Sequence, residues 1–421
     1  MLRHSRFCAI YIRGFKSYLV ERNLSLGFKN SEALFETVIV RLGGEIGIKS
    51  VWTRRTYEKR LIQNIKATLK HHDIPYENII RQHGRIYIKT SQAKKAALKL
   101  TKVFGISSLS ATSQTTSKLG DITAQSLKLA KRKLQKQNSF AVKCKRVGTH
   151  PYTSRDICQQ IGREILEVFQ KLQPKVNLTN PDIVIGIEIR QNNAYIYTDT
   201  IAAPDGLPVG TQPKTIALIK PDLNSTVACW LTMKRGCPFV PAYFSENQNK
   251  TAIKQVKNIC KALFGWSIGH STKLYLIPHS QNLSILEQKC PSDLLGIIEK
   301  RLIYRIAAQI AERERAEAII TGETIGAKPY QTLHELKLQD QAIRDYPIHR
   351  PLTGLNSAEI KKLAKRIGIP KALTTTPKKS QAIIPREAAL PTPREVEATE
   401  KKLNMQEIIN ATTEQLETVT I

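Results

Sequence analysis

The sequence predicts a multidomain α/β protein, in which small α+β domains come first and a doubly wound parallel sheet follows. Its 421 residues, 41% of them hydrophobic, can bury substantial cores, and the length suggests about two to four domains. Strand-like and helix-like segments alternate along most of the chain, and from Thr215 short apolar strands and amphipathic helices follow one another in a longer rhythm. Between the two parts, Pro and Gly punctuate residues 202–214 and indicate a domain boundary.

The first half of the chain is patterned as two small α+β units, the second of which begins near Ile106. In the first predicted helix, apolar residues recur at helical spacing from Leu61 to Leu69 and form one stripe. The last two predicted strands turn at Gln191, Asn192 and Asn193. The predicted helices are 53–72, 92–104, 121–136 and 154–172, and the predicted strands are 36–50, 84–91, 139–148 and a pair within 182–201.

The second half alternates short apolar strands with amphipathic helices, which is typical of a parallel sheet covered on both faces. Its first apolar run ends at Ile219, and a loop of about six or seven residues is predicted before the next helix. Such sheets bind ligands beyond the carboxyl ends of their strands, where this loop and residues 321–326 both fall. Residues 374–398 predict a long irregular loop, and residues 395–412 a last helix.

The charge of the chain is strongly positive and unevenly placed. The formal net charge is +30, of which +21 lies in residues 1–200, and residues 78–155 contain 17 basic residues against one acid, Asp121. This density indicates a nucleic-acid partner, whereas a solvated basic face is the plainer alternative. Aromatic residues are not interleaved with the basic run, so phosphate and shape recognition of a structured RNA fits better than a stacking platform.

Other bulk features predict a soluble cytoplasmic protein. The seven cysteines are scattered without a C-x-x-C pair, which argues against a zinc ribbon or a secreted disulfide scaffold. No apolar run is long enough to span a membrane, and we assign no metal ligands. The first 35 residues hold six basic residues and two acids, and they are either an Arg-rich targeting leader or an extension or misplaced start.

Several blocks of the sequence resemble one protein family, in the same order. Residues 140–162 and 180–211 resemble the THUMP domain, an RNA-binding module, of the tRNA 4-thiouridine synthetases, also called tRNA sulfurtransferases. The segment VRLGGEIGIKS (40–50) resembles the opening of that family's ferredoxin-like domain, with one extra glycine. Blocks at 233–237, 319–332 and 349–368 resemble its C-terminal ATP-pyrophosphatase (PP-loop) domain. The resemblance extends from about Glu36 to Leu403.

The resemblance implies a domain order and a reaction. The implied parts are an extension (1–35), a ferredoxin-like domain (36–104), a THUMP domain (105–203), a PP-loop ATP-pyrophosphatase domain (204–373), and a Pro-rich loop with a C-terminal helix (374–421). Family members use ATP and Mg²⁺ to adenylate a tRNA uridine, and then exchange its oxygen for persulfide sulfur to give 4-thiouridine. Sulfur transfer for the thiazole of thiamine is also known in the family.

The resemblance also implies partners and site residues. The partners are tRNA, a persulfide donor such as a cysteine desulfurase or sulfur carrier, and a second copy of the chain. The candidate tRNA phosphate contacts, which are equally compatible with a generic basic surface, are Lys143, Lys145, Arg146, His150 and Arg155. By matching blocks, the ATP-binding positions fall on Leu218, Ile219, Tyr243, Phe244, Lys300, Gly322 and Gln331.

Two positions depart from the family's pattern. Where the family has the loop S-G-G-x-D-S, this chain has K-P-D-L-N-S, so Asn224 and Ser225 are the remnant of the catalytic loop. Pro221 lacks an N–H, the Asp222 side chain takes the space of a phosphate, and Asn224 has no charge for Mg²⁺. The sulfur-carrying cysteine of the family aligns with Lys379 and Ser380, neither of which forms a persulfide.

Other thiols are weighed as substitutes for the missing cysteine. Cys229 and Cys237 flank the helix after the loop, and Cys144 lies in a basic strand where cations would lower its pKa, although buried structural cysteine is the competing interpretation. Two functions therefore stay open. One is a tRNA sulfurtransferase with an unusual active site, and the other is a tRNA-binding scaffold or partner that keeps the fold without the thiolation chemistry.

Overall fold

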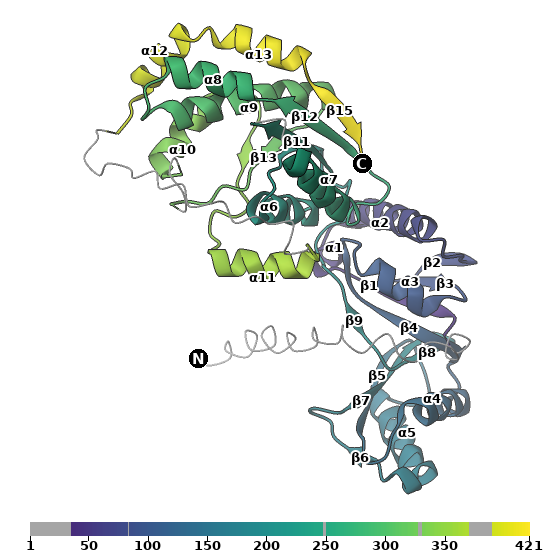
Figure 1. Ribbon diagram of the computed structural model, residues 1–421. Helices are drawn as coiled ribbons and strands as arrows, with labels where there is room; N and C mark the ends of the chain where they lie inside the picture. Colours follow the sequence, from purple (N-terminus) through teal and green to yellow (C-terminus); the bar gives the residue numbers. More distant parts are fainter. Residues whose placement is uncertain (1–34, 83, 247–249, 327–330, 370–389) are drawn as a thin grey trace, which may run out of the picture. The chain divides into compact units, whose positions relative to one another are not determined.

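The computed structural model describes residues 35–82, 84–246, 250–326, 331–369 and 390–421 (Figure 1). The described chain forms two compact units, each assembled from separate stretches of sequence. Unit 1 contains the residues up to Ile39, Ile74–Leu98 and Ser110–Thr200, and unit 2 contains Val40–Asp73, Lys99–Leu109 and Ile201–Ile421. Within the described residues, no helix combines the length and the apolar character needed to cross a membrane.

Unit 1 is built on a mixed sheet with the strand order β2-β3-β1-β4-β8-β7-β5-β6. β5 and β7 run parallel, and β7 returns antiparallel into β8 through the turn predicted at Gln191 and Asn192. β1 and β4 continue into unit 2, where β4 pairs with β9 (Ile201–Ala202). The strands are β1 (Thr37–Leu42), β2 (Asn78–Gln82), β3 (Arg85–Lys89), β4 (Ile106–Thr116), β5 (Ser139–Val147), β6 (Lys175–Val176), β7 (Ile183–Arg190) and β8 (Asn193–Tyr197).

The helices that accompany this sheet follow from the sequence pattern. α5 begins after Thr153 because a capping box forms there: the Thr153 side chain accepts from the Asp156 backbone, and the Asp156 carboxylate accepts from the Thr153 backbone. Its buried residues Ile157, Ile161 and Ile165 recur every fourth position, as one buried face requires. The bounds are α3 (Ala93–Leu100), α4 (Leu119–Lys133), α5 (Ser154–Val168) and a 3₁₀ turn at Gln170–Leu172.

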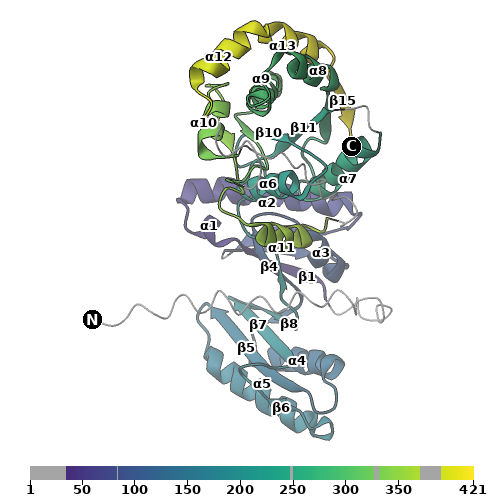
Figure 2. The ribbon, with the colours of Figure 1, turned by 60° about the vertical axis from the view of Figure 1, so that its left-hand side comes forward.

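Unit 2 contains a six-stranded sheet with the order β14-β13-β10-β11-β12-β15. Strands β10, β11 and β15 of this sheet are labelled in Figure 2. Neighbours from β14 to β12 pair parallel, and β15 adds an antiparallel edge, so the predicted α/β class is confirmed. The chain moves outward from β10 first to one side and then to the other, which places the topological switch point between β10 and β13. The strands are β10 (Thr215–Leu218), β11 (Phe239–Ser245), β12 (Lys273–Pro278), β13 (Ala318–Ile320), β14 (Ile348–His349) and β15 (Glu417–Thr420).

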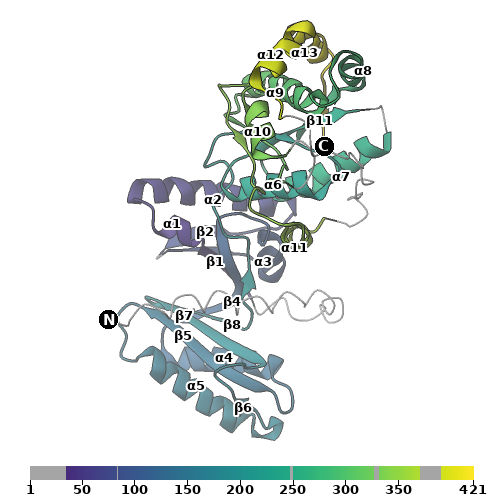
Figure 3. The same cartoon turned by 90° about the vertical axis from the view of Figure 1, so that its left-hand side faces the viewer.

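Helices cover both faces of this sheet (Figure 3). On one face, strand residues such as Ile216 and Val240 pack with Leu302 and Ile306 of α9. On the other face, Ala217 packs among residues of α6, α7 and α11. The remaining helices of unit 2 complete the list: α1 (Gly44–Gly47), α2 (Val51–His71), α6 (Leu223–Lys234), α7 (Lys250–Phe264), α8 (Ser280–Lys289), α9 (Leu295–Glu314), α10 (Leu333–Asp340), α11 (Ser357–Ile367), α12 (Pro393–Lys402) and α13 (Met405–Glu414).

The prediction of one strand over residues 36–50 is wrong. The strand β1 ends at Leu42, and the short helix α1 follows. At the break, a Cβ on Gly43 would lie 2.4 Å from Oδ1 of Asp205 and 3.0 Å from the Gly206 carbonyl oxygen, so a side chain there would displace its neighbours. The two glycines that looked like part of a strand therefore mark its end.

The C-terminal predictions are also corrected. The last helix is divided into α12 and α13, because Asn404 adopts φ 49° between them. α12 begins at Pro393, inside the predicted loop 374–398, since Thr392 caps it and Pro suits the first helical turn. Residues 374–389 of that predicted loop lie outside the described residues.

Candidate functional site

The loop between β10 and α6 is shorter than predicted. β10 ends at Leu218 and α6 begins at Leu223, so Asn224 and Ser225 lie in the first helical turn rather than in the loop. The helix begins early because Asp222 is its N-cap, with Oδ1 accepting a hydrogen bond from the Ser225 backbone at 2.8 Å. The same oxygen lies 2.8 Å from the Ser225 hydroxyl.

Most backbone donors of this loop are already used within it. The N–H of Lys220 donates to the Ser225 hydroxyl at 3.0 Å, and the N–H of Asp222 donates to the Lys220 carbonyl at 2.7 Å. The N–H of Ser225 donates to Asp222, and Pro221 has no N–H at all. A helix N-terminus binds an anion through free N–H groups. Here a side-chain carboxylate takes the place that an anion would need.

The neighbouring segment after β13 packs directly against this helical turn. β10 and β13 are paired strands, with Ala217 opposite Ile320. A Cβ on Gly322 would lie 2.4 Å from the Ser225 nitrogen and 2.6 Å from the Asn224 carbonyl carbon. The absence of a side chain at Gly322 is therefore required by the packing of two protein segments.

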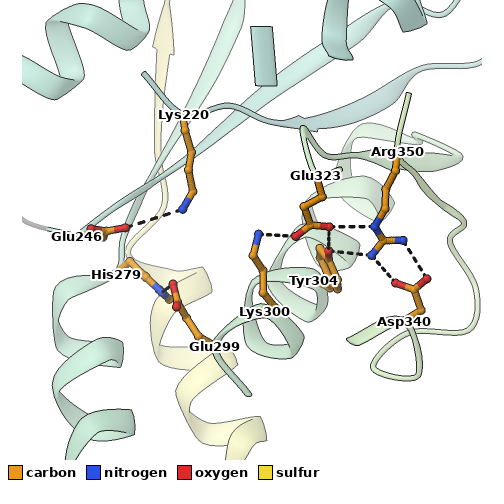
Figure 4. A network of polar contacts seen from close by, with 9 residues as sticks. All are labelled: Lys220, Glu246, His279, Glu299, Lys300, Tyr304, Glu323, Asp340 and Arg350. Carbon is orange, nitrogen blue, oxygen red and sulfur yellow. Dashed lines mark hydrogen bonds and ion pairs between the residues drawn. The ribbon is translucent and has the colours of Figure 1, made fainter. Parts of the chain in front are cut away.

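A network of ion pairs lies beyond the strand ends (Figure 4). Glu323 is at its centre, with Oε1 2.8 Å from Lys300 Nζ and Oε2 3.0 Å from Arg350 Nε. Tyr304 donates to Glu323 at 2.8 Å, and Arg350 also binds Asp340 through both terminal nitrogens, at 2.9 and 2.6 Å. Burial alone would raise the pKa of Glu323, but Lys300, Arg350 and Tyr304 outweigh it and lower that pKa to about 2.

Two further pairs of ionisable side chains are drawn in Figure 4. His279 follows β12, is fully buried, and places Nε2 3.5 Å from Glu299 Oε1. Lys220 and Glu246 are both exposed and are 3.9 Å apart, which is a weak contact. In the described part of the chain, no three His, Cys, Asp or Glu side chains are grouped so as to hold a metal ion.

The structure does not gather the predicted ATP-binding side chains on one surface. Leu218 and Phe244 belong to the core on one face of the sheet, whereas Ile219 and Tyr243 belong to the core on the other face. These four residues therefore have only their backbone groups in common at the carboxyl ends of β10 and β11. Lys300 is held by Glu323, and Gln331 accepts a backbone hydrogen bond from Gly326 at 2.9 Å. These ATP-binding assignments stay predictions.

Burial raises the pKa of each of the three cysteines weighed as substitutes. The prediction that cations lower the pKa of Cys144 is wrong, since burial outweighs Arg146 and raises that pKa to about 11. Burial raises the pKa of Cys229 well above its usual value, and it raises the pKa of Cys237 as well. A raised pKa removes the thiolate that sulfur chemistry needs. Lys379 and Ser380 lie outside the described residues.

The five predicted RNA contacts lie on or beside β5, on two faces of the sheet. Lys143 and Lys145 are exposed, while the alternate residue Cys144 faces α5 through Ser154 and Cys158. By strand alternation, the two lysines point to the face without α5.

The other three predicted contacts lie around the N-terminus of α5. Arg146 donates to the Gly148 carbonyl at 3.1 Å and lies 3.4 Å from His150 Nδ1. The other ring nitrogen of His150 is 2.7 Å from the Gln191 carbonyl. Arg155 is exposed in the first turn of α5. The structure thus holds Arg146 and His150 in place and leaves Arg155 in solvent.

A groove of about 500 Å³ lies on the lysine-bearing face of unit 1. Its floor includes Tyr87 and Tyr195, whose rings stack at 4.8 Å. Lys145 is opposite Glu188 in the sheet, and Glu188, which is buried, is opposite Tyr195, so the side chains of Lys145 and Tyr195 point to the same face of the sheet. The walls are mostly uncharged amides and hydroxyls, among them Asn78 and Gln114. Such groups form hydrogen bonds with nucleotides without repelling phosphate.

Sequence reasoning missed the residues of unit 2 that form the ion-pair network around Glu323. Glu323 and Arg350 lie in the blocks 319–332 and 349–368, which were recognised as motifs, but no charge pairing between them was predicted. Tyr304 is spaced four residues from Lys300 on α9, and this helical spacing was an available signal. Their pairing across three elements required the tertiary structure.

Comparisons with known proteins cover the same segments. The family model of the ThiI ferredoxin-like domain matches residues 37–110, the THUMP model matches residues 117–199, and the model described as thiamine biosynthesis protein (ThiI) matches residues 210–405. The predicted ferredoxin-like and THUMP domains are thereby confirmed as parts of the fold.

Curated relatives and a solved structure resemble most of the chain. A probable tRNA sulfurtransferase of Methanosarcina mazei is 36% identical over 345 residues, covering 80% of this chain and 84% of the relative. Another, of Thermococcus kodakarensis, is 34% identical and covers 84% of this chain and 93% of the relative. A crystal structure of a 4-thiouridine synthetase–RNA complex with bound ATP is 28% identical, with a TM-score of 0.80, and covers 92% of this chain and 100% of that one.

Proposed function

We propose, from the premise that this chain belongs to the tRNA sulfurtransferase family, that it binds tRNA through unit 1. The observation that supports this proposal is the placement of Lys143 and Lys145, which are exposed on the sheet face that also holds the groove. The groove is lined mostly by uncharged polar groups, together with Glu36 and Lys89. Phosphates would contact the lysines, and exposed sugar or base edges would contact the groove. Arg155 is a separate exposed cation at the start of α5, on the other face of the sheet.

The test is a salt titration of tRNA binding. Fluorescence anisotropy with an unmodified tRNA transcript is measured for the wild type, for Lys143→Glu/Lys145→Glu, and for the matched control Lys254→Glu/Lys261→Glu. The control makes the same charge change at exposed lysines of α7. We expect the first variant to lose affinity by about tenfold or more and to reduce the slope of log K against log salt by about two. Equal loss in both double variants would contradict the proposal.

A second proposal concerns catalysis: the protein binds tRNA as a scaffold or partner, without thiolating it. ATP and Mg²⁺ are implied by the family, but the residues present do not fit the pyrophosphate and the metal. The N–H groups of Lys220, Asp222 and Ser225 are used inside the loop, and the Asp222 carboxylate would repel a phosphate. Asn224 supplies no charge for Mg²⁺. We therefore derive no reaction step through either group.

The sulfur chemistry supports the same proposal. The family position of the persulfide aligns with Lys379 and Ser380, and the cysteines of the described residues that come nearest to a substitute have raised pKa values because they are buried. Sulfur transfer for thiamine would need the same thiol. A persulfide donor and a homodimer stay expectations of the family resemblance, to be tested by copurification and by sedimentation.

Adenylation distinguishes the two functions. A tRNA transcript is incubated with the protein, ATP and Mg²⁺, and pyrophosphate release is measured beside a relative that has an intact S-G-G-x-D-S loop. We expect no tRNA-dependent release from this chain, and no thiolated uridine by mass spectrometry after a persulfide donor is added. Release at the relative's rate would refute the scaffold proposal and leave tRNA binding untouched.

A further inference from the structure

The start of α2 exposes three large apolar side chains in a row of five residues. Ile48 is 83% exposed, Val51 is 69% exposed and Trp52 is 76% exposed. The other two tryptophans of the chain, Trp230 and Trp266, are 1% and 7% exposed. Single exposed apolar residues are ordinary, but a contiguous group that includes tryptophan marks an interaction surface.

Positive charge surrounds this group. Arg55 and Lys59 follow Trp52 at three and seven residues along α2, so they lie on the same side of the helix, and both are exposed. Lys49 precedes the helix and is also exposed. We call these six residues the Trp52 patch: Ile48, Lys49, Val51, Trp52, Arg55 and Lys59.

The nearby carboxylates are bound by arginines outside the patch. Arg235 holds both oxygens of Glu45, at 2.6 and 2.9 Å. Arg54 Nε is 2.8 Å from Glu58, which is 4% exposed. The pKa of Glu45 is lowered chiefly by its hydrogen bond with Arg235, and Lys49 contributes. The local acids are thus compensated, and the patch presents an aromatic face with net positive charge.

We propose that the Trp52 patch is an RNA-binding surface of unit 2, on which the indole of Trp52 stacks on an unpaired or terminal base while Lys49, Arg55 and Lys59 contact phosphates. Aromatic rings beside cations are the combination that holds bases without reading their identity. This inference rests on the proposed tRNA binding and adds a second kind of contact to it. Unit 1 presents cations and hydrogen-bonding groups, whereas this patch presents a stacking ring.

Charge favours RNA over another protein copy or a membrane. A second copy would bring the same cations against each other across a two-fold interface, in a chain whose net charge is +30. Binding along a membrane surface needs an apolar face along a helix, but the apolar residues further along α2, Leu61, Ile65 and Leu69, are buried in the protein. RNA supplies both the negative charge and the flat apolar partner.

Tryptophan fluorescence tests the inference directly. Because Trp52 alone among the three is exposed, it dominates quenching by acrylamide and is removed in Trp52→Phe. We expect the tRNA transcript to protect Trp52 from acrylamide and to quench its emission. We further expect Trp52→Ala to weaken tRNA binding about tenfold, Trp52→Phe to retain affinity within about threefold, and Leu333→Ala, a matched exposed apolar position in α10, to have no effect.

The outcomes separate this inference from the proposed function. The inference is overturned, and the proposed function stands, if the wild type binds tRNA but tRNA changes neither the emission of Trp52 nor its quenching by acrylamide, and Trp52→Ala binds tRNA as tightly as the wild type. If the wild type does not bind tRNA in dilute buffer, the proposed function itself fails. A Trp52 response to protein concentration alone, or to vesicles of anionic phospholipid but not to RNA, would assign the patch to another partner and overturn the inference. Circular dichroism of each variant verifies that it is folded.

Discussion

The carboxyl edge of the unit 2 sheet and the β5 region of unit 1 use charge in opposite ways. At the edge, Lys300 and Arg350 are held by Glu323, and the Ser225 N–H at the start of α6 is held by Asp222. Beside β5, Lys143 and Lys145 form no ion pair or hydrogen bond with a described residue and face solvent. The difference teaches that charges at the edge stabilise the fold, whereas charges beside β5 are available to a ligand. Mutations should therefore change stability at one region and binding at the other.

The largest expected effect comes from Glu323→Gln. This change leaves Lys300 and Arg350 partly buried without their shared carboxylate, which costs about 3–5 kcal/mol of folding free energy for a buried pair. Urea unfolding followed by circular dichroism measures the loss. tRNA affinity at fixed salt should stay unchanged, because Glu323 belongs to the region that stabilises the fold.

Glu246, which directly follows β11 at the carboxyl ends of the same strands, offers a matched control. Glu246→Gln also removes a carboxylate facing a lysine, but Glu246 and Lys220 are exposed and 3.9 Å apart. Its effect on stability should stay within about 0.5 kcal/mol. If the two variants were equally destabilised, burial would not be the cause, and the contrast between the regions would lose its basis.

The second expected effect is the pH dependence of stability. The pKa of Glu323 is lowered from 4.5 to about 2. A carboxyl group with a lowered pKa stabilises the fold above its unfolded pKa, and this contribution is lost as the pH falls through the folded pKa. The stability difference between wild type and Glu323→Gln should therefore shrink by about 3 kcal/mol between pH 5 and pH 2. Denaturant titrations at several pH values measure it, and a difference that stays constant would contradict the assignment.

The contrast between the two regions also shows what the sequence reveals and what it does not. Periodicity predicts α5, because Ile157, Ile161 and Ile165 repeat every fourth residue. The capping residues Thr153 and Asp156 are likewise close in sequence, three positions apart. It also predicts the alternation of strands and helices in unit 2, since buried parallel strands have short apolar signatures.

The features that sequence reasoning missed depend on residues far apart in the chain. Gly43, directly after β1, packs against Asp205, and Glu323 meets Lys300 and Arg350 from separate elements. The pKa direction of Cys144 was predicted from its charged neighbours, but burial by α5 decides it. The local sequence pattern predicts whether a segment is a helix or a strand. Burial and pairing between distant residues are determined only when these elements pack.

The third expected effect concerns the start of α6, where the Ser225 N–H donates to Asp222. Removing the Asp222 carboxylate would make this N–H available to an anion, as the lysines beside β5 already are. Asp222→Ala removes the N-cap and should destabilise the protein by about 1 kcal/mol. The same change frees the Ser225 N–H and removes a negative charge, so millimolar pyrophosphate should raise the melting temperature of this variant and not that of the wild type. Asp222→Asn keeps the cap and serves as the control. Equal responses of all three proteins to pyrophosphate would show that Asp222 does not block the anion.

The smallest expected effect, at Arg155, tests whether solvent-facing charge beside β5 is free to serve a ligand. Arg155 is exposed in the first turn of α5, where the positive end of the helix dipole already disfavours a cation. Arg155→Ala should therefore leave the urea midpoint unchanged or slightly raised, while it lowers the salt slope of tRNA binding by about one and the affinity by a few fold. Arg163→Ala, further along α5, is the matched control. If Arg155→Ala lost stability and kept the salt slope of tRNA binding, Arg155 would stabilise the fold as Arg350 does. The contrast between the two regions would then not hold for Arg155.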